Sequence, residues 1–159
     1  MAEELKITET DDKSLKYKEL LPQLKSLVEK ETDLIANMAN ISAGLHHTFG
    51  WLWAGFYLVK GEELVLGPFQ GPIACTRIKF GKGVCGTAWK TGKSILVPDV
   101  EKFPGHIACS GLSVSEIVVP VFGSKTEIIA VLDIDSERYH VLDETDVKYL
   151  EKIASWFSV

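Results

Sequence analysis

The order in which helix-like and strand-like segments follow one another most constrains the fold of this 159-residue chain. Apolar residues recur at helical spacing over residues 14–30 and again from about residue 33 to 49. Short apolar runs between glycine- and proline-rich turns follow, and a last helix is predicted from Asp143. Because strands do not alternate with long helices, the pattern disfavours a parallel sheet. We therefore expect an α+β domain whose mostly antiparallel sheet of about six strands is flanked by N-terminal and C-terminal helices.

The expected strands lie in the middle of the chain. They are predicted at residues 51–59, 63–67, 76–79, 94–98, 116–122 and 127–135. The stretch 67–72 is interpreted as a loop rich in structure-breaking residues that leads to Cys75, and a short helix is expected between Gly81 and Gly92. The Gly81-x-Gly83 pattern is only a weak signal for a phosphate-binding loop, and a close approach of backbone segments explains it better.

The N-terminal part of the chain allows three further predictions. Residues 1–13 are polar and are expected to form a loose tail of the single domain that spans residues 1–159. Pro22 fits the first helix only near its first turn, because backbone N–H groups there have no partner within the helix and proline lacks this group. Thr32 is predicted to cap the second helix.

Composition and charge exclude several classes of protein. Apolar residues make up 46% and charged residues 25% of the chain, which is typical of soluble domains. The net charge is −5, and no basic cluster is present, which argues against a nucleic-acid-binding surface. The N-terminus lacks the features of a signal peptide, and no apolar run approaches the length of a membrane span. We expect a cytoplasmic protein that binds neither nucleic acid nor membrane.

Cysteine is the residue type with the most chemical potential here. Cys75, Cys85 and Cys109 are odd in number, so without a secretion signal they do not suggest a structural disulfide framework. Cytosolic thiols that pair usually do so transiently, and the spacing matches no common zinc pattern, so no metal is expected. Small neighbours make Cys109 accessible, although its loop taken alone favours an inert thiol.

Three carboxylates are predicted to lie together. Asp133 and Asp135 are two residues apart in an expected strand, so both point to one face of the sheet. Glu116 begins the neighbouring strand of the same hairpin and can join them. Carboxylates this close raise each other's pKa, and they suit an ammonium ligand, a proton transfer or a divalent metal. A solvated strand end is the alternative.

Aromatic residues are dense in the first expected strand. Alternation predicts Trp51, Trp53 and Tyr57 on one face and Phe56 on the other. Core packing is expected for most of them, and one facing a pocket would supply an apolar wall for a small substrate.

Seven motifs, which include all three cysteines, together resemble one known family. They are Trp53-Ala54-Gly55-Phe56-Tyr57, Gly67-Pro68-Phe69-Gln70-Gly71, Ala74-Cys75, Gly81-x-Gly83-Val84-Cys85-Gly86, Phe103-Pro104-Gly105-His106-Ile107-Ala108-Cys109, Ser113-x-Ser115-Glu116-Ile117-Val118-Val119-Pro120 and Val131-Leu132-Asp133-Ile134-Asp135-Ser136. The resemblance is to the free methionine-(R)-sulfoxide reductases, which are single GAF-domain enzymes, and it runs from about residue 31 to the C-terminus. Two residues depart from it: Leu52 stands where the family often has Asn, and Ser110 where it often has Asp.

The resemblance implies a reaction and the thiols that perform it. The substrate is free L-methionine (R)-S-oxide, and Cys109 is the nucleophile that becomes a sulfenic acid. Either Cys75 or Cys85 then forms a disulfide with Cys109, and an external thioredoxin reduces that disulfide. No metal or organic cofactor is implied.

The resemblance also implies a substrate pocket. Glu116, Asp133 and Asp135 would line it, and Trp53 with Tyr57 would enclose the methyl group. A sulfoxide oxygen leaves only once it is protonated, and Glu116 is a candidate for this acid. Another of the carboxylates suits the α-ammonium group, which a peptide-bonded methionine lacks.

Two other functions compete with this interpretation. A GAF sensor would bind a small ligand, or use the cysteines as an oxidation switch, without turnover. A metal-dependent hydrolase built on the three carboxylates would leave the cysteines idle. Independently, apolar edges expected on the first and last helices suggest a homodimer.

Overall fold

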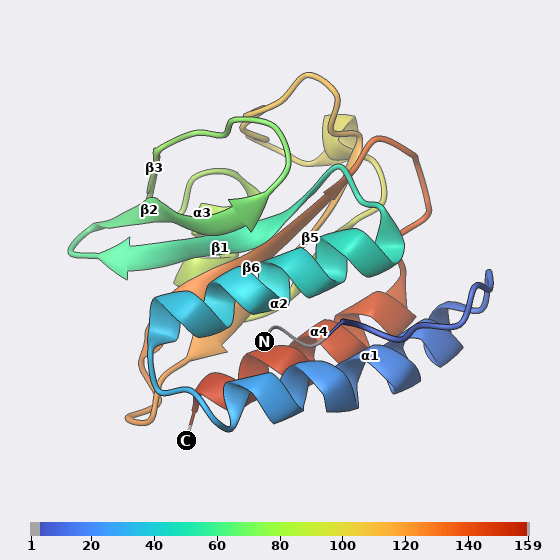
Figure 1. The fold of residues 1–159 in the computed structure, drawn as a ribbon. Helices are drawn as coiled ribbons and strands as arrows, with labels where there is room; N and C mark the ends of the chain where they lie inside the picture. The colour runs from blue at the N-terminus through green and yellow to red at the C-terminus, as the bar shows by residue number, and fades with distance from the viewer. Residues whose placement is uncertain (1–3, 159) are drawn as a thin grey trace.

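The computed structural model describes residues 4–158, which form one sheet of six strands in the order β3-β2-β1-β6-β5-β4 (Figure 1). Every neighbouring pair of these strands is antiparallel. The strands are β1 (Trp53–Lys60), β2 (Glu63–Gln70), β3 (Arg77–Lys79), β4 (Ile95–Val97), β5 (Ser115–Phe122) and β6 (Ile128–Ser136). The α+β architecture predicted from the segment order is confirmed.

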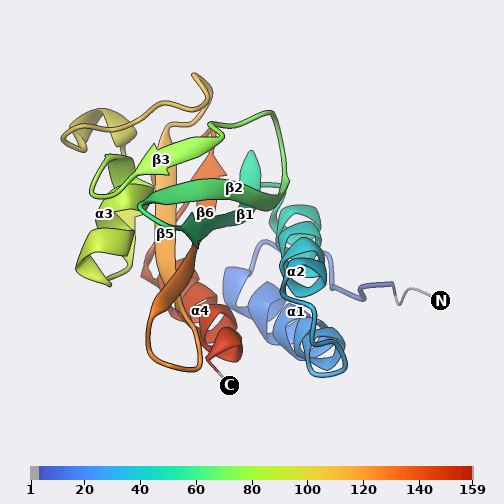
Figure 2. The same cartoon turned by 90° about the vertical axis from the view of Figure 1, so that its left-hand side faces the viewer.

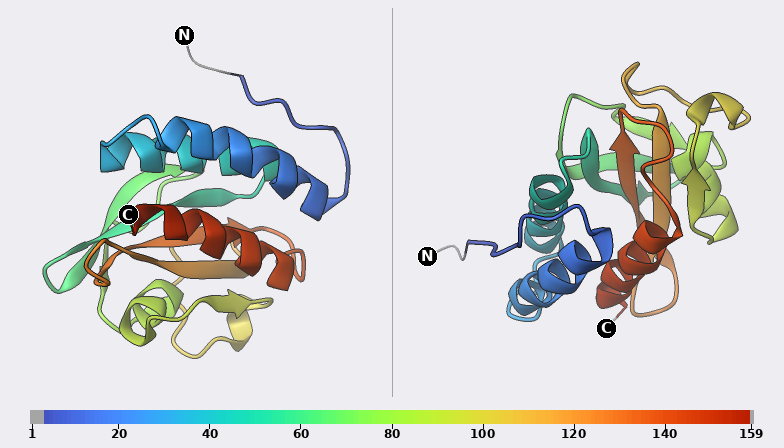
Figure 3. Two further views of the ribbon diagram at one scale, coloured as in Figure 1. Left: turned by 90° about the horizontal axis from the view of Figure 1, so that it is seen from below. Right: turned by 90° about the vertical axis from the view of Figure 1, so that its right-hand side faces the viewer.

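Helices cover both faces of the sheet. The elements are α1 (Lys13–Val28), α2 (Leu34–Phe49), α3 (Gly83–Thr91), α4 (Glu144–Ala154) and the short 3₁₀ turns η1 (Val100–Lys102) and η2 (Ser155–Phe157). Helices α2 and α4 pack on one face, and α1 packs beside both of them (Figure 3, left). Helix α3 packs against β5 and β6 on the other face, away from α1 and α2 (Figure 2).

The sheet therefore separates two apolar cores. The larger core lies between the sheet and helices α1, α2 and α4, and includes Phe56. The smaller core lies under α3 and includes Trp53, Tyr57 and Cys85. Trp51 was predicted to share a face with Trp53, but this prediction is wrong. Trp51 precedes β1, so strand alternation does not apply to it, and it stacks on Phe49 in the larger core.

Three local predictions are corrected by the structure. Pro22 lies inside α1 rather than near its first turn, since buried Tyr17 and Leu24 anchor the helix on both sides of it. Asp33, not Thr32, caps α2, because its carboxylate accepts a hydrogen bond from the Ala36 N–H at 2.8 Å. The predicted loop at 67–72 is mostly strand, as β2 continues to Gln70.

The N-terminal segment lies along the helical layer. Residues 1–3 of the predicted tail fall outside the described residues, and residues 4–12 form neither helix nor strand. Leu5 and Ile7 nevertheless pack against the larger core, and the Lys6 N–H donates to the Gln23 side chain at 2.9 Å. These contacts hold the segment against α1.

The apolar faces of α1 and α4 are buried within the chain. The large apolar side chains that are exposed among residues 4–158 lie outside these two helices. Leu21, Val28 and Val147 of these helices are only partly buried, so pairing of two chains through the edges of α1 and α4 stays a prediction. No helix in the described part is both long and apolar enough to cross a membrane.

Candidate active site

A pocket opens on the α3 face of the sheet, at one end of strands β1, β5 and β6. The sheet contributes six side chains to its lining: Trp53, Tyr57, Ile78, Glu116, Asp133 and Asp135. The cavity is small, with a volume of about 40 Å³. The carboxylates and aromatic residues predicted to form a pocket thus lie in one cavity. Leu52 and Ser110, the two departures from the family pattern, also line it.

Strand register explains why these side chains meet. Asp135 lies opposite Glu116 of β5 on one side and opposite Trp53 of β1 on the other. Residues two apart in a strand share a face, so Asp133 and Tyr57 point to the same side as their neighbours. A Cβ at Gly55, which lies opposite Asp133, would collide with Phe69 and the Trp53 ring. This glycine therefore lets the Trp53 ring pack close to the strand.

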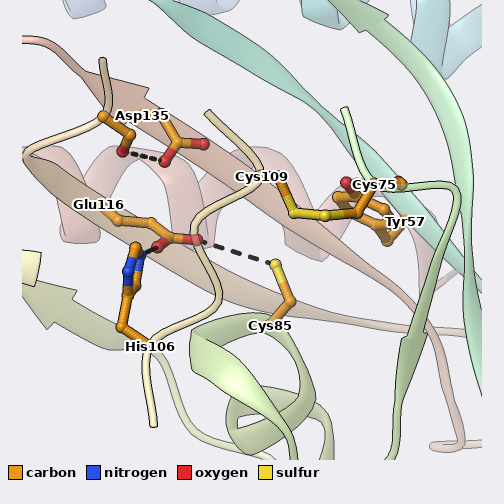
Figure 4. The surroundings of a disulfide bond; sticks show 8 residues. Tyr57, Cys75, Cys85, His106, Cys109, Glu116 and Asp135 are labelled. Carbon is orange, nitrogen blue, oxygen red and sulfur yellow. Dashed lines mark hydrogen bonds and ion pairs between the residues drawn. A yellow bond between two sulfur atoms is a disulfide. The ribbon is translucent and has the colours of Figure 1, made fainter. Parts of the chain in front are cut away.

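Two loops bring a pair of cysteines to the pocket. Cys75, between β2 and β3, forms a disulfide with Cys109, between η1 and β5, with a Cα–Cα distance of 5.3 Å (Figure 4). Cys109 lines the pocket. The hydroxyl of Tyr57, in β1, donates to the Cys75 carbonyl oxygen at 2.9 Å, which ties the loop that carries Cys75 to the sheet. The partner that the sequence left open is therefore Cys75.

Cys85 remains a free thiol. It is buried at the start of α3, and its S–H donates to Glu116 Oε1 at 3.9 Å. Burial, then the charges of Asp133 and Glu116, raise the pKa of the Cys85 thiol well above its usual value. Cys85 therefore stays protonated and acts as a hydrogen-bond donor to the carboxylates.

The carboxylates hold their protons unusually tightly. Glu116 and Asp133 are only 6% and 5% exposed. Burial, followed by the charge of a neighbouring carboxylate, raises the pKa of Glu116, Asp133 and Asp135 well above the usual values. Ser113 opposes this shift at Asp135, because its hydroxyl donates to Oδ1 at 2.5 Å. The pocket can therefore keep a carboxylic acid protonated at a pH where exposed carboxyls are charged.

Two buried polar atoms in the pocket are left without a partner. Asp133 Oδ1 and Trp53 Nε1 make no hydrogen bond to any residue within 4–158. Buried polar atoms are normally paired, so these two atoms are available to a ligand. Cys85, Glu116 and Asp133 also each offer one atom within 4.8 Å of the others, a donor set that a cation could use.

Two residues of the site had no role in the sequence-based prediction. His106 Nε2 lies 3.3 Å from Glu116 Oε2, and Ser113 binds Asp135 as described above (Figure 4). Both residues belong to motifs that carry the family resemblance, and their place in these motifs was the sequence signal that could have identified them. Their contacts depend on how the 103–114 loop folds back over β5 and β6, which no local pattern encodes.

The fold and the site together define a class of protein. Residues 31–158 match the family model described as GAF domain, and this GAF domain carries a cysteine pair beside a pocket of protonatable carboxylates. The chain is 43% identical to a Saccharomyces cerevisiae protein over 89% of this chain and 85% of that protein. It is 44% identical to an Escherichia coli protein over 87% of this chain and 84% of that protein. Both relatives are named free methionine-R-sulfoxide reductase, and this chain belongs to that family.

Solved structures show the same relationship. The free methionine-R-sulfoxide reductase of Neisseria meningitidis, solved in complex with its substrate, superposes with a TM-score of 0.94 at 53% identity. That match covers 98% of this chain and 93% of the other. The reduced form of the Staphylococcus aureus protein fRMsr superposes with a TM-score of 0.86 at 44% identity, over 96% of both chains.

Proposed function

We propose that this chain reduces free L-methionine (R)-S-oxide to L-methionine by thiol chemistry. One observation carries the proposal: Cys109, half of a disulfide, lines the same pocket as Glu116, Asp133 and Asp135. A nucleophilic sulfur and a group of acids are the two components that sulfoxide reduction needs. The relatives that bear the reductase name, and the related structure described as a substrate complex, support this assignment.

The first step transfers oxygen from the substrate to Cys109. In the reduced protein, the Cys109 thiolate attacks the sulfoxide sulfur while Glu116 gives its proton to the sulfoxide oxygen. The oxygen moves to the cysteine, so that L-methionine and a Cys109 sulfenic acid form and Glu116 is left as a carboxylate. The substrate sulfur gains two electrons, and the cysteine sulfur loses them.

The second step forms the disulfide that the structure contains. The Cys75 thiol attacks the sulfenic sulfur of Cys109, the S–S bond forms, and the oxygen leaves as water. An external dithiol of the thioredoxin class then reduces this bond and restores both thiols. Thiols and carboxylates supply every group that these steps use, so the proposal includes no metal or organic cofactor.

Recognition of a free amino acid follows from the charge of the pocket. The α-ammonium group has three N–H donors, and the unpaired Asp133 Oδ1 is an acceptor for one of them. Trp53 stacks on Tyr57 with centroids 5.8 Å apart, and the pair forms an apolar wall for the methyl group. A peptide-bonded methionine sulfoxide would bring an uncharged amide to Asp133 instead.

The proposal extends to the cellular location and the oligomeric state of the protein. A cytoplasmic location fits a reaction that depends on reduced thiols and a thioredoxin-class donor. A homodimer is also proposed, and sedimentation velocity of the reduced and oxidised protein tests it. This dimer would pair through the apolar edges of α1 and α4, where Leu21, Val28 and Val147 are only partly buried.

A coupled assay tests the activity. Purified protein is mixed with thioredoxin, thioredoxin reductase and NADPH, and then with the free R or S epimer of methionine sulfoxide. The R epimer should drive NADPH consumption, whereas the S epimer and N-acetyl-methionine (R)-sulfoxide, which lacks the ammonium group, should not. If neither epimer is consumed, the proposed activity is wrong, and oxidation of the cysteines without turnover would favour a sensor.

A further inference from the structure

We propose that His106 is a positioning residue for Glu116: its Nε2–H donates to Glu116 Oε2 and stabilises the carboxylate that forms when Glu116 gives up its proton. This inference rests on the proposed function, because it concerns the acid step of that reaction. It assigns His106 no contact with the substrate. Its role is to hold one oxygen of Glu116, so that the other oxygen carries the transferable proton.

The contact geometry supports this assignment. His106 Nε2 lies 3.3 Å from Glu116 Oε2, and the two side chains are only 14% and 8% exposed. The other oxygen, Oε1, faces the Cys85 thiol at 3.9 Å (Figure 4). The two oxygens of Glu116 therefore have different neighbours, with a ring nitrogen on one side and the pocket thiol on the other.

The backbone of the loop that carries His106 forms a defined turn. The His106 N–H donates to the Phe103 carbonyl oxygen at 3.2 Å, and Gly105 adopts a φ of +71° in the turn between them. That positive φ suits glycine and strains other residues. The same loop carries Cys109 three residues later, so the acid and the nucleophile are positioned by one segment.

The electrostatic surroundings show why Glu116 needs such a donor. The charged or titratable groups around it are Tyr57 from β1, Cys85 from α3, Asp133 and Asp135 from β6, His106 from the loop, and Lys82 on the exposed part of the pocket lining. Asp135 opposes a new negative charge on Glu116, whereas hydrogen bonds from Asp133 and Cys85 favour it and lower the pKa of Glu116. His106 is the ring N–H donor within hydrogen-bond distance of Oε2, and burial lowers the pKa of its imidazole, which favours the neutral ring with one N–H.

This hydrogen bond is stronger after proton transfer than before it. A donor binds a carboxylate more tightly than it binds a protonated carboxyl group. The bond therefore strengthens as the proton moves to the sulfoxide oxygen, and it lowers the barrier rather than tightening substrate binding. Removing it should slow the chemical step while the KM for the sulfoxide is retained. It should also raise the pKa of Glu116, because a carboxylate that loses a donor is harder to form.

Two variants at position 106 separate positioning from packing. His106→Gln places an amide N–H near the position of Nε2, whereas His106→Leu fills similar space without a donor. We expect His106→Leu to lower the rate of methionine formation in a single turnover by about 10–100-fold, the worth of a hydrogen bond to a charged group. We also expect the loss of rate at alkaline pH, which follows the loss of the Glu116 proton, to move to higher pH in this variant. His106→Gln should keep a rate within about threefold of wild type and leave the pH of that loss unchanged.

The controls keep this inference distinct from the proposed function. If the wild-type protein itself reduces no sulfoxide, the proposed function fails. The inference is then still tested by ¹⁵N NMR of the oxidised protein, which should show the proton of His106 on Nε2. Thermal unfolding checks that each variant is folded, and His106→Asn, whose shorter amide does not reach Oε2, replaces His106→Leu if the latter does not fold. A wild-type rate in His106→Leu, equal losses in the Leu and Gln variants, or an unprotonated Nε2 would each overturn the assignment.

Discussion

Cys75 and Cys85 are both close to the pocket, yet their surroundings give them different chemistry. Cys85 is 4% exposed and donates its S–H to Glu116, and its raised pKa keeps it protonated. A protonated thiol is a poor nucleophile. Cys75 lies in a loop and is already bonded to Cys109. At the residue scale, the environment therefore favours Cys75 as the partner in catalysis.

Single cysteine substitutions test this difference. Cys109→Ser should abolish methionine formation, because the nucleophile is lost. Cys75→Ser should release at most one methionine per protein, since the sulfenic acid then has no partner to form the disulfide. Cys85→Ser is the matched control and should turn over repeatedly with thioredoxin. Quantification of methionine per protein with excess sulfoxide distinguishes the three, and a single turnover by Cys85→Ser would contradict the assignment of Cys75.

Glu116 is predicted to be the acid that protonates the sulfoxide oxygen. Glu116→Gln should slow the chemical step by roughly 10²–10⁴-fold, the usual contribution of a general acid. Because burial raises the pKa of Glu116, wild-type activity should persist above the usual titration range of a glutamate and fall as the pH rises through that raised value. This alkaline limb should be absent in Glu116→Gln. Rapid-quench rates measured across pH provide the check, and a wild-type rate in the variant would refute the role of Glu116.

Asp133 should reduce stability at neutral and alkaline pH. Its pKa in the folded protein is raised by burial and by the Glu116 charge, so its contribution to folding is present below the pKa of the unfolded chain, about 3.9. That contribution is lost as the pH rises through the folded value. Asp133→Asn, which cannot ionise, should therefore stabilise the oxidised protein at neutral pH, by about 1.4 kcal/mol for each unit by which the folded pKa exceeds the unfolded value.

Calorimetry of wild type and Asp133→Asn at several pH values measures this effect. The difference in Tm should vanish near pH 3.5, where the carboxyl is protonated in both states, and should grow as the pH increases (about 2–4 °C for each kcal/mol). Asp11→Asn, at an exposed position of the N-terminal segment, is the control and should show no comparable gain. A Tm difference that is constant across pH would rule out titration of Asp133 as the cause.

The sequence allowed the main residues of the site to be predicted, but not all their contacts. Asp133 and Asp135 could be placed together because strand periodicity is local, and Glu116 because a hairpin fixes its partner strand. The choice between Cys75 and Cys85 could not be made, because it depends on where two distant loops meet. His106 and Ser113 were missed for the same reason.

At the scale of elements, one polar junction joins the first and last helices. Asp146 of α4 is fully buried and accepts hydrogen bonds from the Tyr17 hydroxyl at 2.7 Å and from Lys13 Nζ at 2.6 Å. The same carboxylate accepts the Asp143 N–H at 2.9 Å and so completes a capping box at the start of α4. One side chain thus starts a helix and attaches it to another.

Tyr17→Phe tests how much this junction contributes to the free energy of unfolding. Loss of the hydroxyl leaves the buried Asp146 with one donor fewer, so unfolding should become easier by about 1–3 kcal/mol. Tyr149→Phe is the control, because that ring stacks on Tyr17 at 4.6 Å while its hydroxyl makes no hydrogen bond within residues 4–158. The control should change stability by less than about 0.5 kcal/mol in urea titrations. Equal effects of the two substitutions would show that packing, not the hydrogen bond, matters.

The errors in predicted elements have a common physical origin. Pro22 breaks a helix in isolation, but α1 is held on both sides of it by buried side chains. Gly67 and Pro68 suggest a loop, yet β2 runs through them because pairing with β1 continues to Gln70. In both cases tertiary packing overrode a local preference.

For the whole molecule, the disulfide links loops on two separate parts of the sheet. Cys75 and Cys109 are 34 residues apart in the sequence, and closing a loop of that length is worth about 4 kcal/mol in the chain-entropy description. The oxidised protein should therefore have a Tm about 10 °C above that of the reduced protein. Calorimetry with and without a dithiol measures the difference. Cys75→Ser should not respond to the dithiol, whereas Cys85→Ser should behave like wild type, and a wild-type Tm indifferent to the dithiol would contradict this expectation.

The position of the pocket on only one face of the sheet has a practical consequence. Helices α1, α2 and α4 occupy the opposite face, so an anchor placed on their outward-facing positions would leave the pocket entrance unobstructed. In such a layer of protein on an electrode, each oxidised amino acid that arrives would convert two thiols into a disulfide. The electrode could then reduce that disulfide and regenerate the thiols.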